Sequence, residues 1–382
     1  MQFQANFPIL IAHRDVAAQS VAGVRLRQVQ HDLEAHGWKT ILVDTREDAG
    51  IVAGAHRGLS AIVFGAEGLR GNPAALEKVV NELRTVHERA PGLPIIALGE
   101  AAAIRADLPQ AADAQRSLAA ILYLYEDTAE FLARQIVRAA TGYLEGLLPP
   151  FFKALAHHTE RSAYSWHTPG HAGGVGFLKS PVGHALHAFF GENTLRSDLS
   201  VSVPELGSLL DHTGPVKEAE TYAARVFGSD HTYFVTNGTS TANKVVWHSM
   251  AGRDDLVIVD RNCHKSLLHS LIMTGATPIY FTPTRNDYGI IGPIPLSQFS
   301  PEAIRDKVAA SPLARGKTGP ARIAVVTNST YDGLCYNAEK IKAVVADQVD
   351  AVHFDEAWYA YAAFHDFYSG RHGMGVKRGH AR

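Results

Sequence analysis

The chain has 382 residues, of which 46% are hydrophobic and 19% charged, and its formal net charge is −2. This length allows two or more domains, each with its own core. The balanced charge excludes a surface built for nucleic acid or for an anionic membrane, and no apolar stretch reaches the length of a membrane span. The two cysteines have neither metal-type nor redox-type spacing and the amino terminus does not resemble a signal peptide, so we expect a cytoplasmic protein.

The first third of the chain alternates short apolar strands with helical segments. Strands are predicted over residues 8–12, 40–43, 60–64, 94–98 and 120–124. Helical periodicity separates them, including residues 21–36 and 74–88. This alternation is typical of an α/β fold, and it predicts a flavodoxin-like, doubly wound sheet over residues 1–129.

The residues at the ends of these strands disfavour two functions of such a sheet. A receiver domain needs an acceptor aspartate after the third strand, where the chain reads Val63-Phe64-Gly65. A flavin or nucleotide site needs a glycine-rich turn after the first strand, where it reads Ala12-His13-Arg14-Asp15. We therefore expect this domain to serve structure or assembly.

The middle of the chain contains helices and then glycine-rich loops. A long helical stretch over 126–148 ends at Pro149-Pro150, and we predict a helical linker over residues 130–160. The loops that follow carry His167 and His171 on a Pro-Gly turn. Because these histidines do not share a helix face, we predict no metal site there.

A turn of small residues lies between the next predicted strand and the helix after it. A helix is expected over 217–227, a strand over 232–235 and another helix over 242–248, with Asn237-Gly-Thr-Ser-Thr241 before the last. This arrangement places backbone N–H groups and hydroxyls around a phosphate at a helix N-terminus. An ordinary N-cap explains one hydroxyl but not three in a row. The turn is not a P-loop, because the Gly-x-x-x-x-Gly-Lys pattern is missing.

Polar residues stand at or just after the ends of three further predicted strands. They are predicted over residues 256–260, 322–327 and 351–354. His264 comes just past the end of the first, where α/β proteins build sites. Asp355 directly follows the last, and a buried aspartate needs a cationic partner. A protonated pyridine nitrogen would serve, and a structural salt bridge is an equal alternative for Asp355 taken alone.

Over its whole length the chain resembles the bacterial Orn/Lys/Arg decarboxylases, pyridoxal-phosphate (PLP) enzymes with the aspartate-aminotransferase fold. Long ordered motifs carry the resemblance: Thr168-Pro-Gly-His171, Leu206-Gly-Ser-Leu-Leu-Asp-His-Thr-Gly-Pro215, Thr236-Asn-Gly-Thr-Ser-Thr241, Asp260-Arg-Asn-Cys-His-Lys-Ser266, Ser329-Thr-Tyr-Asp-Gly333 and Phe354-Asp-Glu-Ala-Trp358. The resemblance implies an assembly ("wing") domain over residues 1–129 and the amino-terminal part of the PLP domain over 161–382. It disfavours another activity of the same fold, such as an aminotransferase.

The resemblance also implies the roles of five residues. Thr239 and Ser240 would bind the phosphate of PLP, and Trp358 would contact the cofactor. His264 would stack on the ring, which keeps the ring from tilting, and Asp355 would keep the pyridine nitrogen protonated. The protonated ring accepts the electrons left at Cα when carbon dioxide departs. We therefore expect His264 and Asp355 to be catalytic.

The chain departs from the family pattern after Asp355. Family enzymes continue into a Ser/Thr-x-His-Lys segment whose lysine binds the cofactor covalently, whereas Lys377 lies in a Gly-rich, basic segment that does not match. We therefore expect the 382 residues to be an inactive, truncated decarboxylase. The alternative is a non-catalytic assembly fragment or a gene remnant.

The substrate is expected to be a basic amino acid. Arginine, giving agmatine, is favoured because Asp355-Glu-Ala-Trp-Tyr359 and Gly333-Leu-Cys-Tyr-Asn337 look closer to the arginine enzymes. Lysine, giving cadaverine, comes next because the stretch 236–244 looks closer to the lysine enzymes. Ornithine is third. The resemblance further implies a homodimer, with a higher oligomer through the wing as an option.

Overall fold

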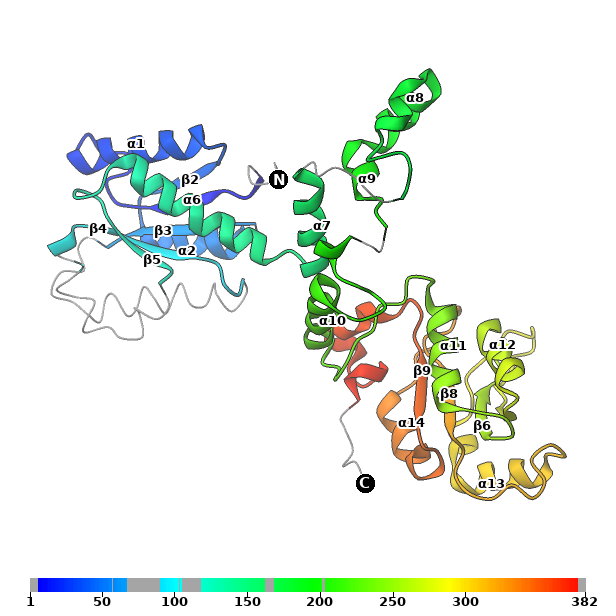
Figure 1. Cartoon of the computed structure of the whole chain (residues 1–382). Coiled ribbons are helices and arrows are strands. Elements are labelled where there is room, and N and C mark those ends of the chain that lie inside the picture. The colour runs from blue at the N-terminus through cyan, green and yellow to red at the C-terminus, as the bar shows by residue number, and fades with distance from the viewer. Residues whose placement is uncertain are drawn as a thin grey trace. The chain divides into compact units, whose positions relative to one another are not determined.

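The computed structural model describes residues 6–56, 58–66, 90–102, 104, 118–161, 168–200 and 203–376. The chain divides into two compact units, Met1–Ala163 and Tyr164–Arg382 (Figure 1). The helix predicted over 74–88 lies outside the described residues. Within the described ranges, no helix has the length and apolar character needed to cross a membrane.

The first unit is built on a five-stranded parallel sheet with the order β2-β1-β3-β4-β5. Its strands are β1 (Ile9–Ala12), β2 (Thr40–Val43), β3 (Ala61–Gly65), β4 (Ile95–Gly99) and β5 (Ala120–Tyr123). Its helices are α1 (Val21–Ala35), α2 (Arg46–Ala55), α6 (Ala129–Gly146) and α7 (Pro150–Glu160). Alternate residues of β1 enter different cores: Ile9 and Ile11 pack with α1 and α6, and Leu10 packs with α2. The order and the helices on both faces are those of a flavodoxin-like fold.

Helix α6 packs in the core of the first unit, so it is no linker. Its apolar stripe is buried in the same cluster as α1 and the central strands, and consists of Leu132, Ala133, Ile136, Ala140 and Leu144. Such i, i+4 spacing places these side chains on one helix face, and α6 lies beside α1 (Figure 1). The predicted linker over 130–160 is therefore wrong for α6, and the first compact unit extends to Ala163.

The second unit is built on a parallel sheet with the order β7-β6-β8-β9. Its strands are β6 (Leu256–Asp260), β7 (Thr277–Phe281), β8 (Ile323–Thr327) and β9 (Val352–Asp355). Its helices are α8 (Pro181–Phe190), α9 (Glu192–Ser197), α10 (Gly214–Phe227), α11 (Thr239–Met250), α12 (Lys265–Thr274), α13 (Pro301–Ala310) and α14 (Ala338–Val345). Short 3₁₀ helices span Val175–Lys179, Pro204–Leu206, Leu296–Phe299, Ala346–Gln348, Ala360–Phe364, Asp366–Tyr368 and Gly373–Gly375. Residues of α11 and α12 join a core on one face of the sheet, and residues of α13 and α14 join a core on the other.

Residues 232–235 form no strand, contrary to the prediction. Within the described ranges no strand lies beside them to complete a ladder. The backbone N–H of Phe234 instead donates to the buried carboxylate of Glu220 at 3.0 Å, and Tyr233 remains 61% exposed. A β-rich sequence becomes a strand only where a neighbour accepts its hydrogen bonds.

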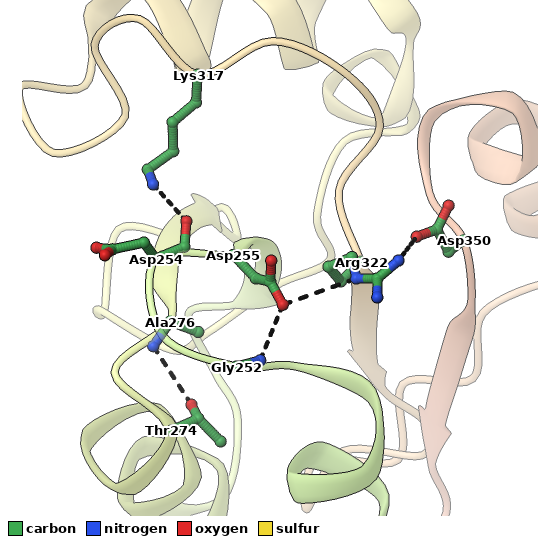
Figure 2. Close-up of polar contacts among 8 residues, drawn as sticks. All are labelled: Gly252, Asp254, Asp255, Thr274, Ala276, Lys317, Arg322 and Asp350. Atoms are coloured by element: carbon green, nitrogen blue, oxygen red, sulfur yellow. Dashed lines mark hydrogen bonds and ion pairs between the residues drawn. The ribbon is translucent and has the colours of Figure 1, made fainter.

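Charged residues join the strands of the second sheet at their amino ends (Figure 2). Arg322, just before β8, lies 2.7 Å (Nη1) from Asp350 Oδ2 and 3.7 Å (Nε) from Asp255 Oδ2. Nearby, Lys317 Nζ donates to the carbonyl of Asp254. These groups are exposed, so each pair contributes little to stability. These pairs lie at the amino ends of the strands, whereas open α/β sheets bind ligands at the carboxyl ends, at the opposite edge of the sheet.

Candidate active site

Polar side chains gather at the carboxyl ends of β6, β8 and β9. Asp260 ends β6, is buried, and accepts from the backbone N–H groups of Asn262 at 2.8 Å and Thr327 at 3.3 Å. Burial raises the pKa of the Asp260 carboxyl above its ordinary value. In the ladder between β8 and β9, Thr327 stands opposite Asp355. Two carboxylates from separate strands therefore lie at one edge of the sheet.

Asp355 is a buried carboxylate with one oxygen left unbonded. Its side chain is 5% exposed, and Oδ2 accepts from Asn243 Nδ2 at 3.1 Å. Oδ1 is buried and has no hydrogen-bond partner within the described ranges, and no ion pair reaches it there. A buried, partly satisfied carboxylate is costly unless something completes it. A cationic N–H donor from a ligand fits this oxygen, and the structural salt bridge considered from the sequence is not found within the described ranges.

Helix α11 runs antiparallel along β9. Asn243 bonds to Asp355, and one turn later the indole Nε1 of Trp247 donates to His353 Nδ1 at 3.3 Å. Burial lowers the pKa of His353. Thr239 precedes Asn243 by four residues, about 6.0 Å of helix rise. The same register therefore carries Thr239 past the carboxyl end of β9.

The N-terminus of α11 is open to an anion. The helix begins at Thr239, three residues earlier than predicted, so Thr239 and Ser240 lie in its first turn. No side chain caps it, and the N-cap is Gly238, whose φ of 74° is in the left-handed region that favours glycine. The first-turn N–H groups and the two hydroxyls therefore offer donors to a phosphate.

His264 is connected to Asp355 through two residues that the sequence reasoning did not single out. His264 caps α12, and its Nδ1 lies 2.9 Å from Ser266 Oγ. Asn243 Nδ2 donates to the same hydroxyl at 3.0 Å. Asn243 and Ser266 are both buried. The structure thus joins two of the predicted site residues in one hydrogen-bonded chain.

Trp358 lies apart from this chain of hydrogen bonds. Its side chain is 49% exposed, and its ring centroid lies 6.3 Å from those of Tyr359 and Tyr361. Burial, with the Cys335 thiol nearby, raises the pKa of the Tyr359 phenol. Among the described residues, Trp358 makes its ring contacts with Tyr359 and Tyr361 rather than with His264, so its role at a cofactor stays a prediction.

Asn328 and Glu356 fix the segment that follows β9. Asn328 Nδ2 donates to Glu356 Oε1 at 2.7 Å and to the carbonyl of Arg371 at 2.9 Å. The backbone N–H of Gly373 donates to the same Glu356 oxygen at 2.8 Å. Burial raises the pKa of the Glu356 carboxyl. These bonds hold the segment around Arg371–Gly373 against the residues that follow β8 and β9.

The histidines of the glycine-rich loops have protein partners. His171 Nε2 lies 3.1 Å from Asp198 Oδ2, and His212 Nδ1 lies 2.9 Å from the buried Glu220. His167 lies outside the described residues. In the described part of the chain no group of three or more His, Cys, Asp or Glu residues is arranged to hold a metal ion.

Comparisons with known proteins match both units. The family model for the Orn/Lys/Arg decarboxylase major domain matches residues 149–381, and that for the Orn/Lys/Arg decarboxylase N-terminal domain matches residues 21–143. The chain is 63% identical over 373 residues to "Lysine decarboxylase LdcA" of Pseudomonas aeruginosa, covering 98% of this chain and 50% of the relative. It is 40% identical over 341 residues to the "Biodegradative arginine decarboxylase" of Escherichia coli, covering 88% and 44%. Other relatives are named lysine and ornithine decarboxylases.

The solved structure of lysine decarboxylase A from Pseudomonas aeruginosa shares 62% identity with the chain. It matches 98% of this chain and 50% of its own length, with a TM-score of 0.81. This likeness confirms the predicted fold, a flavodoxin-like wing followed by part of an aspartate-aminotransferase-like PLP domain. The chain spans about half the length of the relatives it matches. With both family domains matched and one relative similar over nearly the whole chain, the chain belongs to the Orn/Lys/Arg decarboxylase family.

Proposed function

We propose that this chain serves the PLP-dependent α-decarboxylation of a basic amino acid. The observation that carries the proposal is the buried Oδ1 of Asp355, which lacks a partner within the described ranges and lies at the carboxyl end of β9. A protonated pyridine nitrogen would satisfy this oxygen. The uncapped start of α11 lies one helical turn beyond Asn243, in the direction where a phosphate on the same cofactor would be held.

The residues present fit PLP at both ends. Thr239 and Ser240 would bind its phosphate, Asp355 would accept from its ring nitrogen, and His264 would cover its face. When bound, PLP would supply a protonated pyridine ring as the acceptor for the electron pair left at Cα by departing carbon dioxide. Asp355 holds the proton on that nitrogen, and burial strengthens the attraction because little water screens it. His264 would keep the ring plane from tilting, so that the scissile bond could be held perpendicular to the π-system.

We propose lysine as the first substrate, arginine as the second and ornithine as the third. The motifs around Asp355 and Gly333 favoured arginine, and the comparisons give that preference no support. Identity is 63% with the lysine decarboxylase of P. aeruginosa, over 98% of the chain, and 40% with the arginine enzyme of E. coli, over 88%. The greater similarity extends over both units, so it supports lysine.

We further propose that the chain forms a homodimer in the cytoplasm, with the wing able to build a higher oligomer. Free Cys263 and Cys335 suit a reducing compartment. Large apolar side chains on α8 support an association surface, because Val182 and Phe189 are both 82% exposed. Sedimentation of the chain at several concentrations would measure this association.

The proposed function is tested by ligand binding to the 382-residue chain. Titration with pyridoxamine 5′-phosphate should give one saturable site, and pyridoxamine without the phosphate should bind about tenfold more weakly or worse. Thr239→Val together with Ser240→Ala should remove most of that phosphate preference. Absence of saturable binding, or an unchanged preference in the double variant, would refute the site. The affinities of the ligand-loaded chain for lysine, arginine and ornithine then rank the substrates, and tighter binding of arginine than of lysine would reverse the proposed order.

A further inference from the structure

Asn243 lies at the centre of the candidate site, where it contacts two elements at once. It is 2% exposed on α11, and its Nδ2 lies 3.1 Å from Asp355 Oδ2 and 3.0 Å from Ser266 Oγ. Ser266 Oγ in turn lies 2.9 Å from His264 Nδ1. We propose that Asn243 is a positioning residue, which orients Asp355 at the edge of the cofactor ring and, through Ser266, His264 on its face. This inference rests on the proposed function.

The direction of each hydrogen bond follows from the groups involved. An amide nitrogen carries two hydrogens and accepts none, and an ionised carboxylate only accepts. Asn243 Nδ2 therefore donates once to Asp355 and once to Ser266. The opposite orientation of the amide would set its carbonyl oxygen against the Asp355 carboxylate, which the like partial charges disfavour.

The proton position on His264 follows from the backbone. The backbone N–H of Ser266 donates to His264 Nδ1 at 3.2 Å, and a backbone N–H can only be a donor. Nδ1 is therefore an acceptor, and the ring proton is held at Nε2. The Ser266 hydroxyl accepts from Asn243 and donates its own hydrogen to the same Nδ1. His264 is thus fixed in one tautomer, with Nε2–H as the donor that it can present.

This chain of bonds makes the two oxygens of Asp355 inequivalent. Oδ2 is occupied by Asn243, so the carboxylate cannot rotate freely, and Oδ1 remains for the ring nitrogen. One turn along α11, the Trp247–His353 bond keeps the helix in register on β9. The site is therefore ordered before the cofactor arrives, which is the condition for a strong directional contact.

The test compares two ligands on two variants of the full 382-residue chain. The ligands are pyridoxamine 5′-phosphate and its 1-deaza analogue, in which CH replaces the ring nitrogen. Asn243→Leu removes the donors at nearly constant volume. Ser249→Ala is the matched control, because it removes an exposed hydroxyl donor from the same helix, bonded at 2.8 Å to the Val246 carbonyl, without touching Asp355. Dissociation constants are measured by calorimetry.

The wild-type chain should prefer the pyridine ligand by about tenfold or more, as expected of one charge-assisted hydrogen bond. Asn243→Leu should remove most of this preference, because it should weaken binding of the pyridine ligand more than binding of the deaza ligand, and Ser249→Ala should keep the preference. Equal weakening of both ligands by Asn243→Leu, or an unchanged preference, overturns the positioning role. If the wild-type chain binds neither ligand, the proposed function itself fails, and the inference fails with it.

A second measurement needs no ligand. The ¹⁵N chemical shifts of the His264 imidazole, assigned by difference from His264→Gln, report its tautomer. The wild-type chain should show Nε2–H, and Ser266→Ala, which removes the hydroxyl but keeps the backbone N–H, should shift the Nδ1 resonance and leave the proton on Nε2. A wild-type His264 that carries its proton on Nδ1 would contradict the hydrogen-bond chain whatever the binding data show.

Discussion

Replacing Asp355 by asparagine should stabilise the ligand-free chain and weaken cofactor binding at the same time. The wild-type carboxylate is buried with Oδ1 lacking a partner in the described part of the chain. An unsatisfied buried group costs about 1–3 kcal/mol, and more if charged. Asparagine keeps the shape, can turn its oxygen toward Asn243 and removes the charge. Because its own amide hydrogens stay unpaired, we expect a net gain of about 1 kcal/mol in the free energy of unfolding, or roughly 2–4 °C in Tm for a unit of this size.

The same change removes the charge-assisted hydrogen bond to the ring nitrogen. Such a bond contributes about 1.5–3 kcal/mol, so the Kd for pyridoxamine 5′-phosphate should rise by about 10- to 150-fold. Calorimetric unfolding of the free chain and isothermal titration measure the two effects. Asp350→Asn is the matched control: it lies just before β9, pairs with the exposed Arg322, and should change stability by less than about 1 kcal/mol and binding not at all. A destabilised Asp355→Asn chain with unaltered affinity would refute the assignment of Oδ1.

Three further predictions test the energetics of the two units. Burial lowers the pKa of His353, so the unfolded chain binds more protons and stability should fall as the pH drops from about 6.5 through that lowered pKa; urea unfolding at several pH values should show a flatter profile for His353→Gln. Phe281, fully buried and 4.5 Å from the ring of Phe299, should lose about 3–5 kcal/mol of unfolding free energy on replacement by alanine, and a loss under about 1 kcal/mol would contradict its place in the core. A fragment of residues 1–161 should melt cooperatively, whereas residues 1–128, which lack the buried stripe of α6, should not fold, as circular dichroism would show.

The sheets could be predicted from the sequence because most of their strands are short apolar runs with polar ends. Predicted strands 40–43 and 256–260 coincide with β2 and β6, and predicted strand 351–354 differs by one residue from β9. A strand buried on both faces needs a continuous apolar run, which is a strong local signal. β7 was not predicted, because Thr277 and Pro278 interrupt the apolar run. Its proline is tolerated because β7 is the edge strand next to β6.

The errors concern pairing and packing between distant segments. Residues 232–235 have strand-like composition, and only the arrangement of the other strands shows that no described neighbour pairs with them. The stripe of α6 is equally compatible with a linker helix and a core helix. Its partner α1 lies about a hundred residues earlier in the chain. The contact between the two regions is seen where Arg25 Nε of α1 donates to the carbonyl of Leu124, just before α6 begins, at 2.6 Å. A hydrophobic stripe predicts that a helix is buried, but it does not identify the surface that buries it.

The same limit explains why Asp355 and His264 were found from the sequence and Asn243 was not. Asp355 ends an apolar strand and His264 comes shortly after the end of another, so chain position alone marks them. Asn243 acquires its role because the spacing of two polar residues in α11 is close to the spacing of two polar residues in β9. In α11, Asn243 and Trp247 are four residues apart, about 6.0 Å, and in β9 His353 and Asp355 are two residues apart, about 6.6 Å. These spacings are close enough for two polar pairs to form side by side. Both spacings can be read from the sequence. However, Asn243 and Asp355 are 112 positions apart, and only the fold packs this helix against this strand.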